Sequence, residues 1–312
     1  MRRGLLLLLL PLLVVSFHGT AQLWHGNTYG QKSPDATLLV NDSNRIVIRF
    51  DLNGFHTQTV STPNGTQAIV SVPQMASMLE KGAPDLPQYP IPVIIGDRSE
   101  MRVSVIDGQY TDYPDIEIAP SKGIISRQVN PDDVPYTYES MYRENAFYPN
   151  TPAYLESPYI LRDFRGQNIM VRPFAYNPVT KTLRVYQNLT IEMNATGHEG
   201  ENPKTSRKRR TITIDAERSH AYSRLFINYS PKAPYTFIED EGEMVVICPE
   251  AYLEAMRPFV DWKNLSGRPT TLVNLTEIGG NDEVLIKDFL KGIYDDPNRD
   301  LAFILLVGDY DD

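Results

Sequence analysis

Short hydrophobic runs separated by turn-forming residues fill the first two thirds of the chain. Residues 45–50 alternate apolar and polar side chains with a period of two, which is typical of a strand with one buried and one solvated face. Asn177-Pro178 marks a turn between two later runs. Runs of strand length occur at residues 36–40, 45–52, 67–72, 92–95, 102–106, 168–173 and 182–186. This spacing predicts a β-rich domain, an antiparallel sandwich or barrel-like structure.

The pattern changes to α/β in the last quarter of the chain. Residues 244–248 form a continuous apolar run, as a buried parallel strand does, and residues 251–265 have helical spacing. Gly267 should end this helix, and Pro258 should kink it or begin a new one. A strand at 270–275, a helix at 284–293 and a strand at 302–307 follow. We therefore expect a β-α-β-α-β unit, the first part of an incomplete doubly wound parallel sheet.

The N-terminus has the features of a secretory signal peptide. Arg2 and Arg3 precede an apolar run over residues 4–17, and Gly19-Thr20-Ala21 supplies the small residues of a cleavage site. The run is shorter than the roughly 20 apolar residues that a transmembrane helix needs. We expect cleavage after Ala21 and an exported protein with no membrane span after the signal is removed.

Net charge and cysteine content exclude one class of partner and one kind of cross-link. The net charge of −9 argues against nucleic acid, because phosphate binding requires clustered Lys and Arg. Cys248 is the only cysteine, so an exported protein of this sequence has no internal disulfide.

Two polar stretches separate the β-rich and α/β parts. Residues 197–210 end in Arg207-Lys208-Arg209-Arg210, which is either a processing site for a trypsin-like cut or an ordinary solvated loop. Lys232 in the second stretch, residues 229–234, is the alternative cut site. The sequence thus predicts a signal peptide at 1–21, a β-rich domain at 22–234 and the start of an α/β domain at 235–312.

Several blocks of the chain resemble the gingipains, the cysteine peptidases of family C25. Phe259-Val260-Asp261-Trp262-Lys263-Asn264 with its following Gly267, and Leu305-Leu306-Val307-Gly308-Asp309, resemble the opening of the gingipain catalytic domain. The segments that resemble the propeptide are GAPDLP at 82–87, RPFAYNP at 172–178 and FINY at 226–229.

The resemblance implies a bacterial endopeptidase made as an inactive zymogen. Its β-rich propeptide would assist folding, inhibit its own catalytic domain and then be removed by proteolysis. The enzyme would act on protein substrates, at the cell surface or in the extracellular space, with a Cys nucleophile and a His base on a caspase-like α/β fold. The family often uses type IX secretion, whose C-terminal signal would lie beyond residue 312.

Within these 312 residues we expect no catalytic residue. His198 and Cys248 are the tempting pair, but Glu199 follows the histidine and Pro249 follows the cysteine, which is the wrong order of flanking residues. His198 also lies in the propeptide-like part, and no histidine follows His220. A polar turn at His198 and a small buried hydrophobe at Cys248 are the expected roles.

Asp309 is the candidate metal ligand. It follows the third strand of the α/β part, and ligand sites gather at the carboxyl ends of parallel strands. Asp311 and Asp312 supply further oxygens nearby. The resemblance implies that Asp309 binds a structural calcium ion, with the other ligands coming from later in the chain. Alternatively, Asp309 only fixes the turn through backbone hydrogen bonds.

Other features leave alternatives open. Arg218 or Arg224 could mimic a substrate in a specificity pocket, or be ordinary surface charge. Pro234 precedes Tyr235 where the family has a basic residue, which leaves the cut site and the preference for Arg or Lys undecided. Two other functions fit the same pattern: a sortase-like peptidase of type IX secretion, and a non-catalytic secreted inhibitor or binding protein.

Overall fold

The computed structural model describes residues 22–26, 33–42, 44–205, 214, 216–230 and 242–308. The chain separates into two compact units, Met1–Lys232 (unit 1) and Ala233–Asp312 (unit 2). No helix in the described ranges is long and apolar enough to cross a bilayer. The expected signal peptide, the basic run at 207–210, Lys232, Pro234, Asp309, Asp311 and Asp312 lie outside the described residues.

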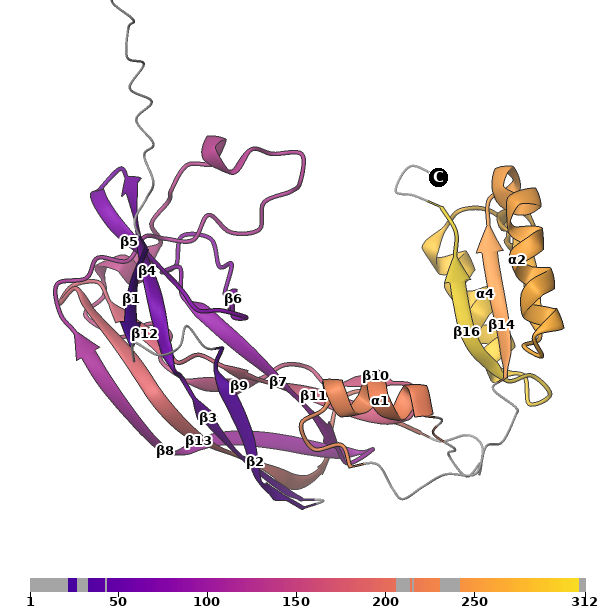
Figure 1. Cartoon of the computed structure of the whole chain (residues 1–312), viewed down its shortest axis with the longest axis horizontal. Helices are drawn as coiled ribbons and strands as arrows, with labels where there is room; N and C mark the ends of the chain where they lie inside the picture. The colour runs from indigo at the N-terminus through magenta and orange to yellow at the C-terminus, as the bar shows by residue number, and fades with distance from the viewer. Residues whose placement is uncertain are drawn as a thin grey trace, which may run out of the picture. The chain divides into compact units, whose positions relative to one another are not determined.

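Unit 1 is built from three antiparallel sheets (Figure 1). The first has the order β1-β4-β5, formed by β1 (Gln22–Gly26), β4 (Gly54–Thr62) and β5 (Gly65–Ser71). The second has the order β10-β11-β7-β6, with β9 also paired to β11: β6 (Ala76–Ser77), β7 (Pro87–Ile95), β9 (Ala153–Leu155), β10 (Tyr159–Leu161) and β11 (Phe164–Val171). The third has the order β12-β13-β3-β2, with β8 also paired to β13: β2 (Asp35–Asn41), β3 (Arg45–Asp51), β8 (Ser99–Tyr113), β12 (Phe174–Asn177) and β13 (Thr182–Glu199).

One hydrophobic core joins the three sheets of unit 1. Phe55 of the first sheet, Val93 and Ile169 of the second, and Phe50 and Leu189 of the third are all buried in the same cluster. The three sheets pack together through these side chains, which fits the expected sandwich or barrel-like structure. The fold class predicted for this part of the chain is confirmed.

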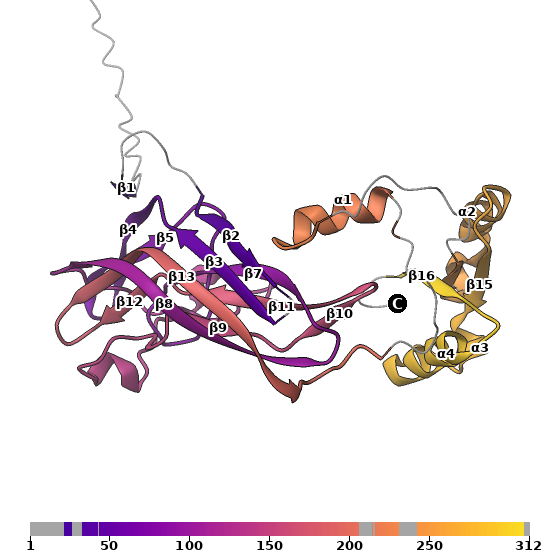
Figure 2. The same cartoon turned by 90° about the horizontal axis from the view of Figure 1, so that it is seen from below.

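Two strands are much longer than the hydrophobic pattern predicts. β8 has 15 residues and β13 has 18, and they pair over most of their length (Figure 2). The far half of β8 is exposed and polar, so no apolar alternation marks it in the sequence. Gly108 lies at this pairing because a Cβ there would come 2.9 Å from Leu189 Cδ2.

The predicted alternation along β3 is only partly correct. Arg45 and Arg49 are exposed as expected, but Val47 on the same face is buried. β3 lies between β2 and β13, and Val47 is directly opposite Val40 and Glu192 in these neighbours. A central strand therefore has less water access than its period-two pattern implies.

Unit 2 is a three-stranded parallel sheet with the order β15-β14-β16. Its elements are β14 (Glu243–Cys248), η3 (Glu250–Tyr252), α2 (Leu253–Leu265), β15 (Thr270–Asn274), α3 (Leu275–Ile278), α4 (Glu283–Asp295) and β16 (Leu301–Leu306). α2 and α4 cover opposite faces of the sheet (Figure 2), as right-handed crossovers in opposite directions require. The predicted β-α-β-α-β order is confirmed.

The predicted ends of α2 can also be compared with the structure. Gly267 follows the helix with φ +86°, in the left-handed region, so it ends the helix as expected. Pro258 lies inside α2, which continues through it as one helix. The proline therefore does not begin a second helix, and it lacks the N–H that would donate a hydrogen bond at this position.

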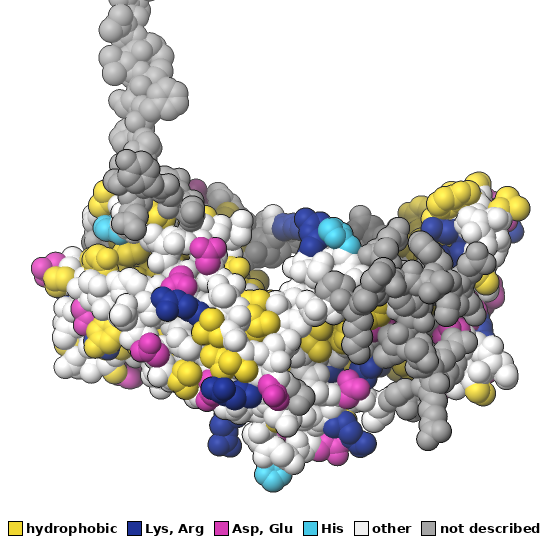
Figure 3. All heavy atoms as spheres, turned by 60° about the horizontal axis from the view of Figure 1, so that its bottom comes forward, with side chains coloured by type: hydrophobic (Ala, Val, Ile, Leu, Met, Phe, Trp, Pro, Cys, Tyr) yellow, Lys and Arg dark blue, Asp and Glu magenta, His cyan; other side chains and the backbone are white. Residues whose placement is uncertain are grey.

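Basic and acidic side chains are mixed on the surface of unit 1. On the face drawn in Figure 3, Lys and Arg alternate with Asp and Glu over the sheets and do not gather into a stripe of one sign. Several are paired across strands, including Arg45 with Glu192 at 2.6 Å and Arg184 with Asp112 at 2.8 Å.

Unit 2 exposes large apolar side chains on both of its long helices and on its outer strand β16. Ile304 and Leu306 of β16 are 48% and 61% exposed, and Trp262 of α2 is 58% exposed. Among the described residues, no strand pairs with the outer edge of β16.

We therefore predict that trypsin degrades residues 242–308 several-fold faster than residues 44–205, because an open edge and exposed apolar faces favour local unfolding. Mass spectrometry of a digestion time course would measure both rates, and a resistant fragment spanning unit 2 would contradict the prediction.

Candidate functional site

The most prominent feature of unit 1 outside its sheets is the segment 122–138, which we call the lobe. It lies between β8 and β9, contains η1 (Pro131–Asp133), and is followed by η2 (Ser140–Arg143). Both ends of the lobe are tied to one residue: the Gly82 N–H donates to the Ser121 carbonyl at 2.9 Å, and the Glu139 N–H donates to the Gly82 carbonyl at 3.0 Å. The lobe is thus a closed loop whose ends meet on the scaffold.

Only glycine fits at this junction. Gly82 has φ +80°, a conformation that side chains rarely adopt. A Cβ there would lie 2.6 Å from Glu139 Cγ and 3.3 Å from the Glu139 backbone nitrogen. Gly82 begins the GAPDLP block, so a sequence block that resembles the propeptide coincides with the anchor of the lobe.

The strand-like segment that leads into the lobe is buried. The Ala119 N–H donates to the Ala68 carbonyl, and the Ala119 carbonyl accepts from the Asp85 N–H. The Ser121 N–H donates to the Ala83 carbonyl at 2.7 Å. Ile118 and Ala119 are fully inaccessible to solvent. The lobe therefore starts from a rigid base.

The lobe is also braced from within. Lys122 Nζ donates to the Pro131 carbonyl at 2.7 Å and lies 4.6 Å from the centre of the Tyr136 ring. Asn130 Oδ1 accepts from the Asp132 N–H at 3.1 Å and caps η1. These contacts hold the two arms of the lobe together.

The tip of the lobe displays a basic residue between hydrophobic ones. Ile124 is 87% exposed and Val129 is 43% exposed, which is unusual for branched aliphatic side chains. Arg127 between them is exposed and makes no hydrogen bond or ion pair with any residue that the structure describes. Nothing in the sequence around Arg127 marks it as a functional residue, because this stretch has neither strand nor helix periodicity.

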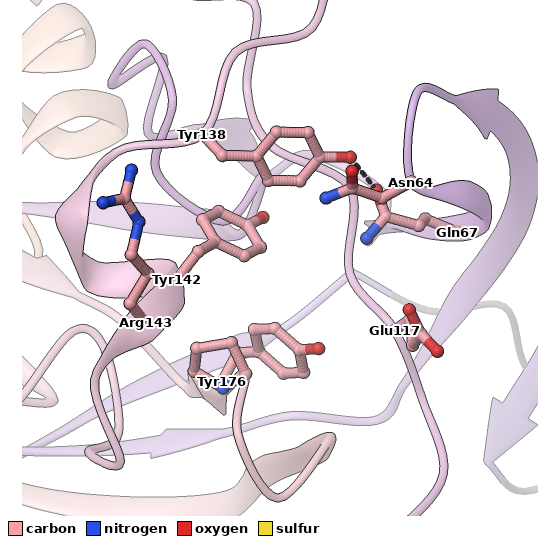
Figure 4. Close-up of a pocket in the computed structure, with 8 residues that line it drawn as sticks. Asn64, Gln67, Glu117, Tyr138, Tyr142, Arg143 and Tyr176 are labelled. Atoms are coloured by element: carbon pink, nitrogen blue, oxygen red, sulfur yellow. Dashed lines mark hydrogen bonds between the residues drawn. The ribbon is translucent and has the colours of Figure 1, made fainter.

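A small hollow lies behind the returning arm of the lobe (Figure 4). It has a volume of about 250 Å³ and is lined by Tyr138, Tyr142, Tyr176, Gln67, Asn64, Glu117, Arg143 and Pro178. Tyr138 Oη donates to Gln67 Oε1 at 2.5 Å, and Tyr142 Oη donates to the Ile118 carbonyl at 3.0 Å. Burial raises the pKa of the Tyr142 hydroxyl well above its ordinary value, so it stays a neutral donor. These hydrogen bonds fasten the returning arm to the scaffold.

In unit 2, the candidate chemistry lies at the carboxyl ends of the parallel strands. β14 ends at Cys248, which is fully buried, and burial raises the pKa of its thiol, with a smaller contribution from Glu250. A buried thiol with a raised pKa is a poor nucleophile. Glu250 accepts a hydrogen bond from the Asn274 side chain at the end of β15. The described residues contain no cluster of three or more His, Cys, Asp or Glu that could hold a metal ion.

The structure places the other predicted residues in ordinary surroundings. The expected turn at His198 is wrong, since His198 is exposed within the last residues of strand β13 in unit 1. Cys248 is buried in unit 2, as expected. Arg218 lies 3.4 Å from the Asp163 carboxylate. Arg224 is exposed on α1 (Ala216–Leu225).

Family comparisons agree with this division of the chain. The C25 propeptide model matches residues 26–230, and the model of peptidase family C25 matches residues 238–312. The chain belongs to the C25, or gingipain, family. It carries a gingipain propeptide followed by the start of a C25 peptidase domain.

Relatives from Porphyromonas gingivalis align with nearly all of the chain. Gingipain R2 is 34% identical over 307 residues, which cover 96% of this chain and 41% of gingipain R2. Lys-gingipain is 25% identical over 279 residues, which cover 84% of this chain and 16% of Lys-gingipain. A solved complex of the RgpB pro- and mature domains matches with TM-score 0.58 and 33% identity, covering 63% of this chain and 98% of the solved chain. The chain therefore spans about two fifths of the length of gingipain R2.

We predict that Gly82→Ala loosens the lobe. The substitution should cost roughly 1–3 kcal/mol of unfolding free energy from backbone strain, with a further loss from the Glu139 contact. Gly197→Ala is the matched control, because Gly197 also has positive φ, at +84°, but has open space around it. Urea unfolding measures the stabilities, and hydrogen exchange of residues 122–138 measures the lobe. Equal effects of the two variants on the lobe would contradict its anchoring at Gly82.

Proposed function

We propose that the 312 residues are the leading part of a secreted cysteine endopeptidase zymogen, and that unit 1 inhibits the catalytic domain through its lobe. The observation that carries this proposal is the exposed Arg127 at the tip of a lobe whose two ends are fixed to Gly82. A rigid loop that presents an arginine between apolar side chains has the chemistry of a peptidase substrate. Because the loop is already ordered in the free protein, it loses little conformational entropy on binding, which favours tight inhibition.

The lobe also suggests which bonds the enzyme cleaves. An inhibitory segment that resembles the substrate occupies the same pocket as the substrate. Arg127 therefore supports a preference for a basic residue before the scissile bond. Neither Arg218 nor Arg224 fits this role as well, since Arg218 contacts Asp163 and Arg224 lies on a helix, which does not present an extended substrate.

The proposal assigns catalysis to residues outside this sequence. The nucleophile and the base would form a Cys–His pair in the remainder of the peptidase domain, because Cys248 is the only cysteine here and is buried. Unit 1 would also assist folding, since its core is extensive whereas unit 2 exposes apolar strand and helix surface. Export through the signal peptide and type IX secretion to the cell surface or the extracellular space is part of the same proposal.

Inhibition in trans tests the proposal. Unit 1 should inhibit a mature gingipain, and Arg127→Ala should raise the inhibition constant at least about 30-fold, the loss expected for removing a charged anchor of about 2 kcal/mol. Arg224→Ala is the control and should leave inhibition unchanged, because this exposed arginine lies on α1 and is not part of the lobe. Inhibition by Arg127→Ala equal to that of wild type would refute the role of the lobe, and no inhibition by wild type would refute the inhibitor function.

We also propose that Asp309 contributes to a structural calcium site in the longer protein. Its support is its position directly after Gly308 at the carboxyl end of β16, where carboxylate oxygens suit calcium. Calcium should raise the melting temperature of the longer protein, and Asp309→Asn should weaken the apparent affinity about tenfold. Asp288→Asn on the exposed surface of α4 is the control. An unchanged calcium response in Asp309→Asn would rule out this ligand.

A further inference from the structure

The last described segment of unit 1, residues 216–230, turns back onto the β-scaffold after the basic run at 207–210. It consists of α1 and the residues that follow it, and it packs on β7, β10 and β11 (Figure 1). We call residues 216–230 the clamp. Unit 2 begins shortly after it in the sequence, at Ala233.

Aromatic side chains of the clamp pack on aromatic rings of β10 and β11. Phe226 is 2% exposed and stacks on Tyr159 with ring centres 6.5 Å apart. Tyr222 meets the Phe164 ring edge-on at 5.0 Å, and Tyr229 meets the same ring at 5.6 Å. Edge-to-face contacts of this kind add to the burial of the rings.

Gly166 of β11 makes room for this cluster. A Cβ at Gly166 would lie 2.8 Å from the Tyr159 ring and 2.9 Å from the Phe226 ring. The bare backbone therefore lets Phe226 approach the sheet closely.

Asn228 fastens the clamp to the edge of β7 through the strand backbone. Its Oδ1 accepts from the Ile94 N–H at 2.7 Å, and its Nδ2 donates to the Ile94 carbonyl at 2.9 Å. The Ile227 N–H donates to the Pro92 carbonyl at 3.2 Å. The clamp thus satisfies backbone groups of a strand edge as an added strand would.

A polar group closes the other end of the clamp. Asp163, between β10 and β11, accepts a hydrogen bond from Tyr222 Oη at 2.6 Å and lies 3.4 Å from Arg218 Nη1. Burial, followed by the hydrogen bond to Asp163, raises the pKa of the Tyr222 hydroxyl well above its ordinary value. The hydroxyl therefore remains protonated and keeps donating at any physiological pH.

The chain is also anchored upstream of the basic run. Arg165 is 1% exposed, and its guanidinium donates to the carbonyls of Glu201 at 2.6 Å and Asn202 at 3.0 Å. The Lys204 N–H donates to the Asp97 carbonyl at 2.8 Å. Both flanks of the basic run are therefore held on unit 1, at 201–204 and at 216–230.

We propose that the clamp is a non-covalent tether that keeps the downstream chain on unit 1 when the chain is cut between residues 205 and 214. The basic run at 207–210 has four consecutive basic residues and is therefore a ready target for a peptidase that cuts after Arg or Lys. A cut there would nevertheless leave the zymogen assembled. Separation of the two units would begin only with a second cut after residue 230. A role for the order of these two cuts in controlling activation rests on the proposed zymogen function. Retention of the cut chain by the clamp does not depend on that function.

Two engineered cleavage sites test the tether. In the full chain, residues 207–210 are replaced by the recognition sequence of one sequence-specific peptidase, and residues 232–238 by that of another. After both cuts, size-exclusion chromatography and native mass spectrometry should find the peptide that contains residues 214–230 still bound to the fragment that ends near residue 206. After the first cut alone, all downstream residues should remain bound.

Variants of the clamp identify what holds the peptide. Phe226→Ala with Asn228→Ala should reduce the retained peptide at least tenfold, and Arg224→Ala, on the exposed side of α1, should retain it like wild type. Asn228→Asp is the milder variant, because it preserves the size of the side chain and the aromatic cluster but cannot donate to the Ile94 carbonyl. It should also lower retention, and it tests the tether even where the double variant does not fold. Melting curves of the uncut variants monitor folding.

Two results would overturn the proposal: release of the peptide from the doubly cut wild type, or full retention in the folded Phe226/Asn228 and Asn228→Asp variants. Because the readout is the composition of the complex, it is independent of peptidase activity. A lobe variant that loses inhibition leaves the tether intact, and loss of the tether leaves inhibition by the uncut chain intact.

Discussion

The pairing of β13 with its neighbours is the interaction on which the rest of unit 1 depends. This strand is hydrogen-bonded to β3 and β12 along one edge and to β8 along the other, and it sends Leu189, Ile191 and Met193 into the core. Strands from the beginning, middle and end of the unit are thereby joined in a single sheet. A fold dominated by such non-local pairing is expected to form slowly, and both the lobe and the clamp are anchored on the sheets that it joins.

A rigid scaffold with one projecting loop is well suited to inhibition. The scaffold fixes both ends of the lobe at Gly82, and the hydrogen bonds of Lys122 and Asn130 brace its arms. Functional residues often lie on loops that a β-scaffold positions, because the scaffold limits the entropy lost on binding. Ile124 and Arg127 at the exposed tip of the lobe are the side chains through which the proposed inhibition would act.

The two units differ in how completely they satisfy their own surfaces. Unit 1 buries residues of all three sheets in one cluster and encloses the guanidinium of Arg165 with four backbone carbonyls. Unit 2 has a small core around Val245, Ile247, Val273 and Ile293 and exposes large apolar side chains on both helices and on β16. This contrast agrees with a self-sufficient propeptide followed by the start of a larger peptidase domain.

The sequence by itself determined the class of both units, the order of elements in unit 2 and the family. Periodicity reports which side chains face a core, and the core is where this fold is regular, so β2, β3, α2, α4 and the parallel strands were predictable from residues such as Gly267 and the run 244–248. The long exposed half of β8, the buried Val47, the joining of both lobe ends at Gly82 and the docking of Asn228 on Ile94 were decided only by the tertiary structure. Each depends on a partner that is distant in sequence, and no local pattern of apolar and polar residues records which strand edge or backbone carbonyl that partner will be.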